Sequence, residues 1–405
     1  MDKIFGEAVR RRALKLGEEG KDANQIAKIV CDDDPDGANY GIGIMLGSDG
    51  NPMRTSPTLT AYTRSELDKS SGGNYMSSTI QMDALKAAVL DWQQIPQSYW
   101  NHFILSLPSD AGTGAVRTAV DLMLTADKDL NTLGIECLGW PAYKSIAGVN
   151  RMAWKEFDGD AVMAEQGLLP VYQAGPMNTT GLVRDPGVIE ARARSAAQHG
   201  TAVLLDRAYS GFECARMLAT KSYEKVMQTS CERQILPFLE HGVPFALAIS
   251  PTKSFVTFSL RPAGLLLLFC PEISKMQELN KTVTQILRAR GSGFEHPTTR
   301  AFVNALVNDR PLLEAEHRLA LERVAEAESL WRRLANNTSL ASQFSDSYSG
   351  LFRNPQARQG AQVQIYNRHL YPVFSGDRCR LNVTGIPSSE EVAQQHVSAF
   401  AEQCY

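Results

Sequence analysis

Short apolar segments alternate with segments of helical spacing between residues 100 and 300. Within 114–128, for example, Val116, Val120 and Met123 fall on one helical face. This alternation is typical of βαβ units, and it predicts a mostly parallel sheet with helices on both faces. The apolar segments are HFILSL (102–107), TLGIECLG (132–139), GLLPVYQA (167–174), TAVLLD (201–206) and PFALAIS (244–250).

The two ends of the chain show other patterns. Residues 1–40 predict a helix followed by an acidic loop, and residues 311–337 predict one long helix because helical spacing runs through them without a breaker. The last part joins the strand-like VQIYNRHLYPVF (363–374) to a final helix. The spacing of Ser388 and Glu391 predicts a capping box at the start of that helix.

We therefore expect an α/β fold made of two domains. A large domain is predicted over 45–315, and a smaller α+β domain is predicted from 1–44 together with 316–405. A chain of 405 residues is long enough to build two separate cores.

The composition narrows the classes of partner. Hydrophobic residues make up 43% and charged residues 21%, and a net charge of −3 gives no basis for binding nucleic acid or an anionic membrane. The longest apolar run, near 264–270, is too short to cross a bilayer, and the charged N-terminus does not read as a secretory signal. Seven scattered cysteines and the spacing of the histidines predict no metal site, and we expect a protein of the reducing cytoplasm.

Polar residues follow the apolar segments where the predicted strands end, at the sheet edge where ligands bind in such folds. Gly112, Thr113 and Gly114 open a helix after the first segment. Their backbone N–H groups can approach a phosphate, although an ordinary tight turn has the same sequence. Trp140 suits either stacking on a planar ligand or simple packing, and Asn178 suits either a ligand oxygen or a plain turn.

The fourth and fifth segments end in residues that carry chemistry. Asp206 closes an apolar strand, where a carboxylate needs a cationic partner unless it caps a helix, and Tyr209 follows it. Ser250 closes the fifth segment, Lys253 comes three residues later, and Arg261 lies eight residues beyond the lysine. A lysine on such a turn is either solvated and idle or a partly desolvated amine suited to covalent work.

In this order along the sheet edge, the set matches the needs of pyridoxal 5′-phosphate (PLP) chemistry. A lysine amine links to the cofactor, and a carboxylate keeps the pyridine nitrogen protonated so that the ring accepts electrons. Hydroxyl and amide donors hold the ring oxygen, while an arginine and backbone amides hold the phosphate. Each residue alone is ambiguous, and their order is what indicates PLP.

Through these motifs the chain resembles the fold-type I, class I aminotransferases, in particular their aspartate/aromatic amino-acid subgroup. The resemblance covers nearly the whole chain, and it implies a large domain around a mostly parallel, seven-stranded sheet. The matching stretches, in chain order, are Asp2-Lys3-Ile4-Phe5-Gly6, Asn39-Tyr40-Gly41-Ile42-Gly43, Asn74-Tyr75, Gly112-Thr113-Gly114-Ala115, Trp140-Pro141, Asn178, Asp206 to Tyr209, Ser250 to Lys253, Arg261 and Arg380 to Gly385.

The resemblance implies roles for these positions. The implied catalytic residues are Lys253, Asp206, Tyr209 and Trp140. The implied cofactor ligands are Gly112, Thr113, Trp140, Asn178, Asp206, Tyr209, Ser250, Lys253 and Arg261, with Tyr75 from the other subunit of a homodimer. The implied substrate ligands are Arg380 for the α-carboxylate, Arg288 for a distal carboxylate, and Gly43 and Asn178.

The implied reaction is transamination of an L-amino acid, aspartate/glutamate or aromatic, with a 2-oxo acid such as 2-oxoglutarate, the cofactor alternating between PLP and pyridoxamine phosphate. Another PLP-dependent reaction at Cα, such as β-elimination or decarboxylation, uses the same residues. A non-catalytic PLP-binding protein is a third interpretation.

The chain departs from the family pattern at several positions. Tyr143 stands where a histidine is frequent near the stacking tryptophan. Asp206 and Lys253 are 47 residues apart, more than the pattern has, so an insertion lies between them. Ser292-Gly293-Phe294-Glu295 replaces the usual Ser-Asn-Pro-Pro, which leaves Arg290 as a rival to Arg288 for the distal carboxylate.

Overall fold

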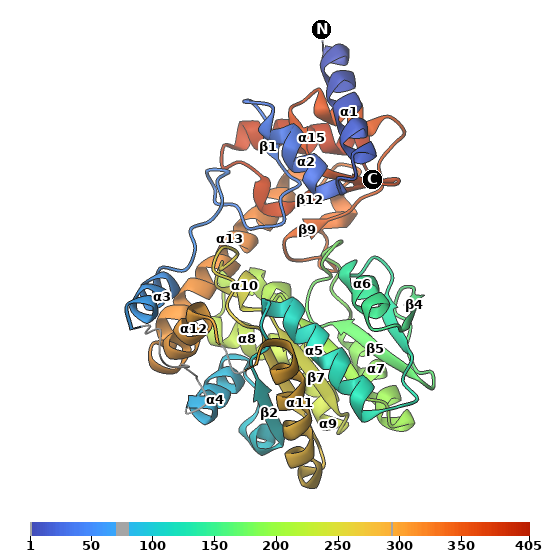
Figure 1. Ribbon diagram of the computed structural model, residues 1–405. Coiled ribbons are helices and arrows are strands. Elements are labelled where there is room, and N and C mark those ends of the chain that lie inside the picture. Colours follow the sequence, from blue (N-terminus) through green and yellow to red (C-terminus); the bar gives the residue numbers. More distant parts are fainter. Residues whose placement is uncertain (1, 70–80, 293–294) are drawn as a thin grey trace. The chain divides into compact units, whose positions relative to one another are not determined.

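The chain divides into two compact units in the computed structural model, which describes residues 2–69, 81–292 and 295–405 (Figure 1). Unit 1 comprises residues 1–53, 176–183 and 321–405, and unit 2 comprises residues 54–175 and 184–320. Each unit contains its own cluster of buried apolar side chains.

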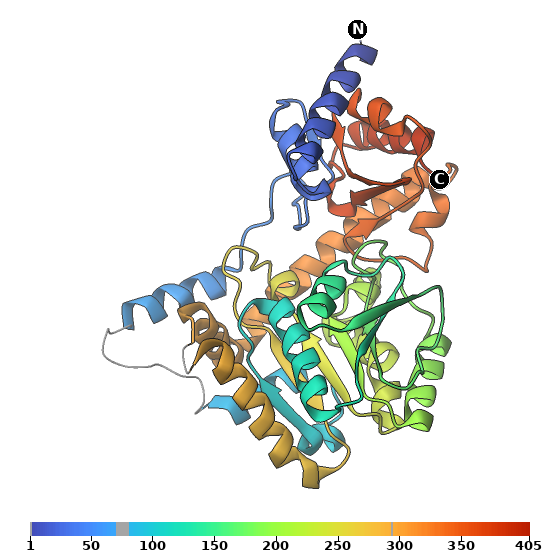
Figure 2. The same ribbon diagram turned by 45° about the vertical axis from the view of Figure 1, so that its right-hand side comes forward.

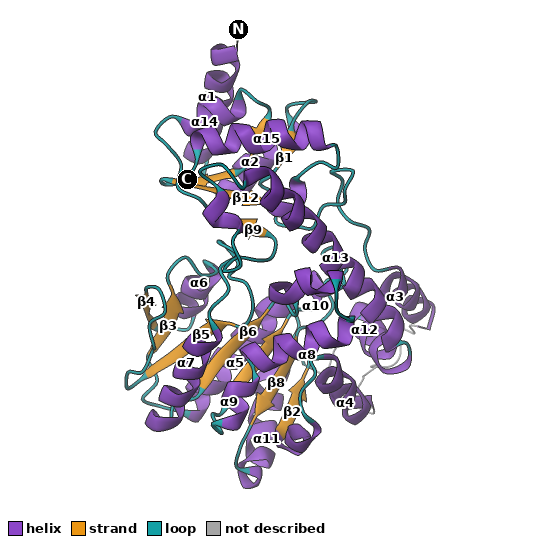
Figure 3. Cartoon of the chain, turned by 180° about the vertical axis from the view of Figure 1, so that it is seen from behind, coloured by secondary structure: helices purple, strands orange, loops and turns teal. Residues whose placement is uncertain are grey.

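A seven-stranded sheet forms the centre of unit 2 (Figure 3). All neighbouring strands run parallel except β8, which is antiparallel to both of its neighbours. The mostly parallel α/β sheet that the sequence predicts is therefore confirmed. In spatial order its strands are β2 (Phe103–Ser106), β8 (Leu265–Phe269), β7 (Phe245–Ile249), β6 (Val203–Arg207), β5 (Leu168–Gln173), β3 (Thr132–Glu136) and β4 (Ala153–Phe157).

The sequence pattern did not predict β4. Its residues Ala153, Trp154, Lys155 and Glu156 are all exposed, so this edge strand lacks the apolar run that marks the other strands. A strand that pairs on one side only and packs little against helices leaves almost no hydrophobic signal in the sequence.

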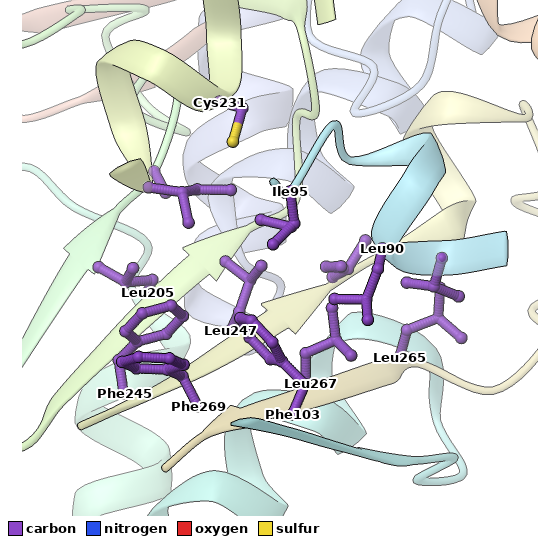
Figure 4. Packing of buried hydrophobic residues seen from close by; sticks show 14 of the residues in the cluster. Leu90, Ile95, Phe103, Leu205, Cys231, Phe245, Leu247, Leu265, Leu267 and Phe269 are labelled. Carbon is purple, nitrogen blue, oxygen red and sulfur yellow. The ribbon is translucent and has the colours of Figure 1, made fainter. Parts of the chain in front are cut away.

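Helices cover both faces of the sheet (Figure 2). Strand β8 shows why a continuous apolar run is needed: Leu266 and Leu268 pack with α5 and α11, whereas Leu265 and Leu267 pack with α4 and α12. Successive strand residues point to opposite faces, so a strand covered on both sides must be apolar throughout. Figure 4 shows the cluster on the side of α4 and α12, in which Phe103, Leu205, Leu247, Leu265 and Leu267 lie together.

The helices of unit 2 include the long one predicted over 311–337. That helix is α13, which begins in unit 2 and runs into unit 1. The helices are α3 (Pro57–Lys69), α4 (Met82–Trp92), α5 (Ala111–Ala126), α6 (Ala142–Val149), α7 (Pro186–His199), α8 (Tyr223–Gln234), α9 (Leu236–Glu240), α10 (Pro251–Ser254), α11 (Met276–Gly291), α12 (Pro297–Asn308) and α13 (Arg310–Ala335).

The stretch between Asp206 and Lys253, in which an insertion is expected, contains three short helices. These are the 3-10 helix Phe212–Ala219, α8 and α9. Their buried side chains, such as Met227 and Phe238, belong to the same apolar cluster as β6 and β7. These helices therefore contribute to the core of unit 2.

Unit 1 holds small sheets and short helices. The single helix expected in 1–40 is two helices, since the chain turns at Gly20 with φ of +83° and Asp22 caps the second helix by accepting from the N–H groups of Asn24 and Gln25. The elements are α1 (Asp2–Glu18), α2 (Ala23–Asp32), β1 (Ala38–Asn39), β9 (Phe352–Arg353), α14 (Ala361–Tyr366), β10 (Leu370–Tyr371), β11 (Val373–Ser375), β12 (Arg378–Asn382) and α15 (Glu390–Gln403).

Two local predictions for unit 1 are wrong. The first half of the strand-like segment 363–374 is the end of α14, because its apolar residues also fit helical spacing. The predicted capping box is absent: Ser389, not Ser388, occupies the N-cap of α15, and its side chain makes no capping hydrogen bond. Among the described residues, no helix is long and apolar enough to cross a membrane.

Close approach of α5 to the start of β8 depends on Gly264. A Cβ built on Gly264 would lie 2.2 Å from the carbonyl oxygen of Ala111. We expect Gly264→Ala to lower the free energy of unfolding by about 3 kcal/mol or more, since backbone must move to relieve the overlap. Urea unfolding of the purified variant measures this loss.

Gly148 is the matched control for Gly264. It lies inside α6, and a Cβ built there meets nothing within 4 Å. Gly148→Ala is expected to raise the free energy of unfolding by about 0.5–1 kcal/mol through helix propensity. Equal effects of the two substitutions would show that the Gly264 contact is unimportant.

Candidate active site

The carboxyl ends of β2, β6 and β7 lie at one edge of the sheet in unit 2. Asp206 of β6 pairs with Ala248 of β7, and the two parallel strands end together. Strand β2 is antiparallel to β8, as β7 is, and so runs the same way as β7. The turns after these strands carry the residues that the sequence predicted for cofactor binding.

The turn after β2 packs tightly against the turn after β7. A Cβ on Gly112 would lie 2.6 Å from the Cβ of Ser250, and a Cβ on Gly114 would lie 1.5 Å from the carbonyl oxygen of Ser109. Both glycines are therefore required by contacts within the protein. Helix α5 begins at this point and leaves Thr113 exposed in its first turn, where unpaired helical N–H groups favour an anion.

Arg261 adds a positive charge to the hollow that the turn after β2 also lines. Its side chain is exposed, and its backbone N–H donates to the carbonyl of Thr257 at 2.8 Å. Arg261, Ser109 and Asp110 line a hollow of about 1060 Å³ in unit 2. The N-terminus of α5 and the guanidinium of Arg261 together make this end of the hollow suited to an anionic group.

Asp206 is a buried carboxylate bound by neutral donors. Its Oδ2 accepts from the hydroxyl of Tyr143 at 2.5 Å, and it also accepts from the backbone of Ala208. Burial raises the pKa of Asp206 to about 6, and the two hydrogen bonds oppose this rise. A carboxylate in this state is stabilised by any cation that enters the site.

Trp140 lies next to this pair at the end of β3. Its ring meets the ring of Tyr143 edge-on, with centroids 5.3 Å apart and planes at 88°. Tyr143 is buried, whereas Trp140 is partly exposed.

Lys253 lies on the single helical turn α10 that follows β7. Its Nζ lies 4.4 Å from the ring centroid of Phe258 and 6.0 Å from that of Tyr209. Aromatic rings thus border the amine, and one of them belongs to the turn after Asp206. Unit 2 therefore brings together Lys253, Tyr209 and Asp206 on two neighbouring turns.

The predicted substrate residues Gly43 and Arg380 lie in unit 1 on segments that are bound to each other. The amide of Asn382 donates to the carbonyls of Ile42 at 2.8 Å and Ile44 at 2.7 Å, on either side of Gly43. Arg380, two residues before Asn382, reaches the side chain of Asn24 at 2.5 Å. The Arg-x-Asn pattern therefore positions the glycine loop as well as its own arginine.

Asn178 also belongs to unit 1, in the short segment 176–183. This turn is closed by hydrogen bonds from Gly181 N to Met177 O and from Met177 N to Leu182 O. Tyr75, which the resemblance assigns to the partner's cofactor, lies outside the described residues.

The two arginines that compete for a distal carboxylate differ in their surroundings. The guanidinium of Arg290 donates to Thr118 at 2.5 Å and forms an ion pair with Asp121 of α5. Arg288 lies exposed on the last turn of α11. Arg290 is thus engaged within its own subunit.

Tyr143 is the residue whose contribution the sequence analysis missed. It was noted only as a departure from a histidine, yet it is the hydroxyl donor to Asp206. The available signal was its position, three residues after Trp140 at the start of a helix that follows a strand end. A buried tyrosine hydroxyl needs a partner, and this partner lies 63 residues away in the chain.

Comparisons with solved structures agree with this fold. The aromatic-amino-acid aminotransferase of Burkholderia pseudomallei, covalently bound to pyridoxal phosphate, superposes with a TM-score of 0.76 at 14% identity, covering 94% of this chain and 96% of that chain. The cytoplasmic aspartate aminotransferase of Saccharomyces cerevisiae gives 0.74 at 16% identity, covering 94% and 96%. The broad-specificity aminotransferase of Leishmania mexicana gives 0.71 at 17% identity, covering 90% and 91%.

The sequence comparison identifies the family. No curated protein sequence matches the chain at a significant level. The family model of aminotransferases class I and II matches residues 42–284, which is more than half of the chain. The chain belongs to the class I and II aminotransferases and is a PLP-dependent aminotransferase.

Proposed function

We propose that this enzyme transfers the amino group of aspartate, glutamate or an aromatic amino acid to a 2-oxo acid such as 2-oxoglutarate, with Lys253 and Asp206 as its central catalytic residues. The observation that carries the proposal is the buried carboxylate of Asp206. It is bound by neutral donors and lies on the strand next to the one that leads into Lys253.

The residues of unit 2 fit PLP. When bound, PLP supplies an aldehyde that reacts with the amino group and a ring that takes up electron density from Cα. The protonated ring nitrogen is the cation that the buried Asp206 otherwise lacks among the groups bonded to it. Trp140, whose side chain is partly exposed beside Tyr143, is assigned to stacking on the ring. The start of α5 and Arg261 hold the phosphate, where the missing Cβ of Gly112 allows close packing against Ser250.

Lys253 acts as the proton carrier in this proposal. With PLP and a substrate bound, its Nζ would take the proton from the substrate Cα and later return a proton to the substrate or cofactor. The rings of Phe258 and Tyr209 lie beside the amine, with centroids 4.4 Å and 6.0 Å from Nζ, and restrict where it can move. The hydroxyl of Tyr209, together with Asn178, is assigned to the ring oxygen.

Substrate binding is assigned to arginines. Arg380 binds the α-carboxylate as a bidentate fork, and the loop around Gly43, which Asn382 fastens by the carbonyls of Ile42 and Ile44, covers the substrate. Arg288 is assigned to a distal carboxylate because Arg290 already pairs with Asp121.

We further propose a homodimer with shared active sites, in which Tyr75 and Arg288 serve the partner's site. The exposure of Arg288 on its own subunit supports this assignment. A reducing, cytoplasmic location is also proposed, and it is supported by the seven cysteines, all of which lie in the described residues and are free thiols.

Lys253 is expected to be required for the release of 2-oxo acid from an amino acid. Adding L-aspartate, L-glutamate or L-phenylalanine to the pure enzyme without a 2-oxo acid is expected to shift the absorbance of the cofactor and release one equivalent of 2-oxo acid. Lys253→Ala should bind PLP but release at least about 10⁴-fold less, since it lacks both the covalent link and the base.

The products distinguish transamination from its competitors. Release of ammonia with a 2-oxo acid, repeated over many turnovers without a 2-oxo acid acceptor, would indicate β-elimination, and release of CO₂ would indicate decarboxylation. Either result would sink the proposed transamination while leaving the PLP site intact.

The buried charge of Asp206 is expected to lower the free energy of unfolding of the cofactor-free protein. Its pKa is raised in the folded state, so the folded protein binds this proton more tightly, and stability falls as pH rises from about 4 through about 6. Asp206→Asn keeps the acceptor for Tyr143 and removes the charge. It is expected to stabilise the cofactor-free protein by on the order of 3 kcal/mol at pH 8, with a smaller gain at pH 5, while PLP binding weakens.

Urea unfolding of the cofactor-free protein at pH 5 and pH 8 checks this expectation. Tyr143→Phe serves as the opposite control, because losing the donor raises the pKa of Asp206 further and destabilises its charged form. A gain for Asp206→Asn that does not change with pH would contradict the assignment of the buried charge.

Substitution of each arginine in turn is expected to show which of the two binds the distal carboxylate of the substrate. Arg288→Leu is expected to raise KM for aspartate by about 30–150-fold, the loss of one charge-assisted interaction, with little effect on phenylalanine. Arg290→Leu should change stability through the lost pair with Asp121 and leave the ratio of the two substrates unchanged. The reverse pattern would assign the distal carboxylate to Arg290.

A further inference from the structure

A histidine to which the proposed function assigns no role is buried in unit 2, in contact with the turn that carries Tyr209 and the turn that carries Lys253. His317 lies on α13 with none of its surface exposed. Its Nε2 lies 3.0 Å from the carbonyl oxygen of Ser210, and its Nδ1 lies 2.8 Å from the hydroxyl of Tyr223. A carbonyl only accepts, so Nε2 carries the proton and donates to Ser210, while Nδ1 accepts.

The environment keeps this histidine neutral. The pKa of His317 is lowered to about 3, chiefly by burial; the hydrogen bond to the Ser210 carbonyl opposes this shift, and the charge of Arg207 adds to it. The indole N–H of Trp92 donates to the Tyr223 hydroxyl at 3.1 Å and also lies 3.4 Å from Nδ1 of His317. Together with the Ser210 carbonyl at Nε2, these contacts give both ring nitrogens hydrogen-bond partners. With its tautomer fixed in this way, His317 is suited to a directional hydrogen bond and unsuited to carrying protons.

The carbonyl that His317 binds belongs to the residue after Tyr209. Ser210 is held a second time, because its hydroxyl donates to the side chain of Gln93 at 3.3 Å. Gln93 also accepts from Arg207 at 3.2 Å, and Arg207 forms a fully buried ion pair with Glu213 at 3.1 Å. The turn from 207 to 213 is therefore fixed from two sides by buried polar groups.

The same imidazole contacts the turn that carries the lysine. The ring of Phe255, two residues after Lys253, lies 5.8 Å from the ring of His317 and meets it edge-on. Trp92 packs on Phe255 as well, with centroids 5.1 Å apart. His317 thus touches both catalytic turns, one through a hydrogen bond and the other through an aromatic contact.

We propose that His317 is a positioning residue that fixes the turn carrying Tyr209 against the turn carrying Lys253, and so sets the geometry between the phenol and the amine. The inference rests on the proposed roles of these two residues. Lys253 Nζ lies 6.0 Å from the ring centroid of Tyr209, and at that range a small shift of either turn changes how the phenol and the bound cofactor act on the amine.

The test replaces the donor while keeping the volume. His317→Phe removes the hydrogen bond to Ser210 and retains an aromatic face for Phe255. Two readouts are measured on PLP-loaded protein: the pKa of the absorbance change of the bound cofactor, and kcat and KM separately. We expect the absorbance pKa to shift by about half a unit or more, and kcat to fall by at least about tenfold with a smaller change in KM.

Two further variants serve as controls for His317→Phe. His317→Gln supplies a side-chain N–H for the Ser210 carbonyl and is expected to restore the absorbance pKa to within about 0.3 of the wild type. Tyr223→Phe removes the hydroxyl at Nδ1, where the Trp92 indole remains, and leaves the Ser210 bond, so it should match the wild type in absorbance pKa even if it lowers the melting temperature. If His317→Phe does not fold, His317→Met, which also lacks a donor, takes its place.

An unchanged absorbance pKa in the folded variant without a donor would overturn the proposal, as would equal shifts in His317→Phe and Tyr223→Phe. Failure of the proposed function gives a different result. In that case the wild-type protein itself would bind no PLP, or its bound cofactor would show no band that depends on Lys253.

Discussion

The buried carboxylate of Asp206 is the feature around which the site is organised. It closes a strand in the middle of the sheet, and the bonds to it come from the hydroxyl of Tyr143 and the backbone of Ala208. Neutral donors lower the cost of the buried charge without removing it. Such a group costs stability in the cofactor-free protein and is matched when a cation binds, and in the proposed function that cation is the protonated ring nitrogen of PLP.

The rest of unit 2 supports this arrangement through two kinds of contact. Apolar packing on both faces of the sheet fixes the strand ends, as the alternating leucines of β8 show. Buried polar networks then fix the turns: Arg207 and Glu213 on one side, and His317 on the other. Apolar packing is not directional, so hydrogen bonds of this kind are needed to hold side chains of a site to within a fraction of an ångström.

Glycines also support the arrangement, because they let backbone segments approach one another closely. A Cβ on Gly112 would overlap the turn after β7 and one on Gly264 would overlap the start of α5, so the turns after β2 and β7 and the start of β8 can meet; Gly114 allows the turn after β2 to fold back on its own Ser109. In unit 1, side-chain amide and guanidinium groups hold backbone segments together by binding their carbonyl groups. Asn382 binds the carbonyls beside Gly43, and Arg323 binds those of Leu46 and Thr384. These contacts hold the glycine loop and the strand of Arg380 as one piece.

The sequence by itself determined the α/β class, the family and the cofactor, because strand periodicity, runs such as LLLLF and the Lys-Arg spacing are local properties of the chain. It failed at β4, whose exposed residues carry no apolar signal, and at Tyr143, whose partner is 63 residues away. Only the tertiary structure decided that Tyr143 donates to Asp206, that Arg290 pairs with Asp121, and that residues 176–183 belong to unit 1. The physical reason is that a hydrogen-bond partner depends on which strands and helices become neighbours, and that order is set by the packing of the whole sheet.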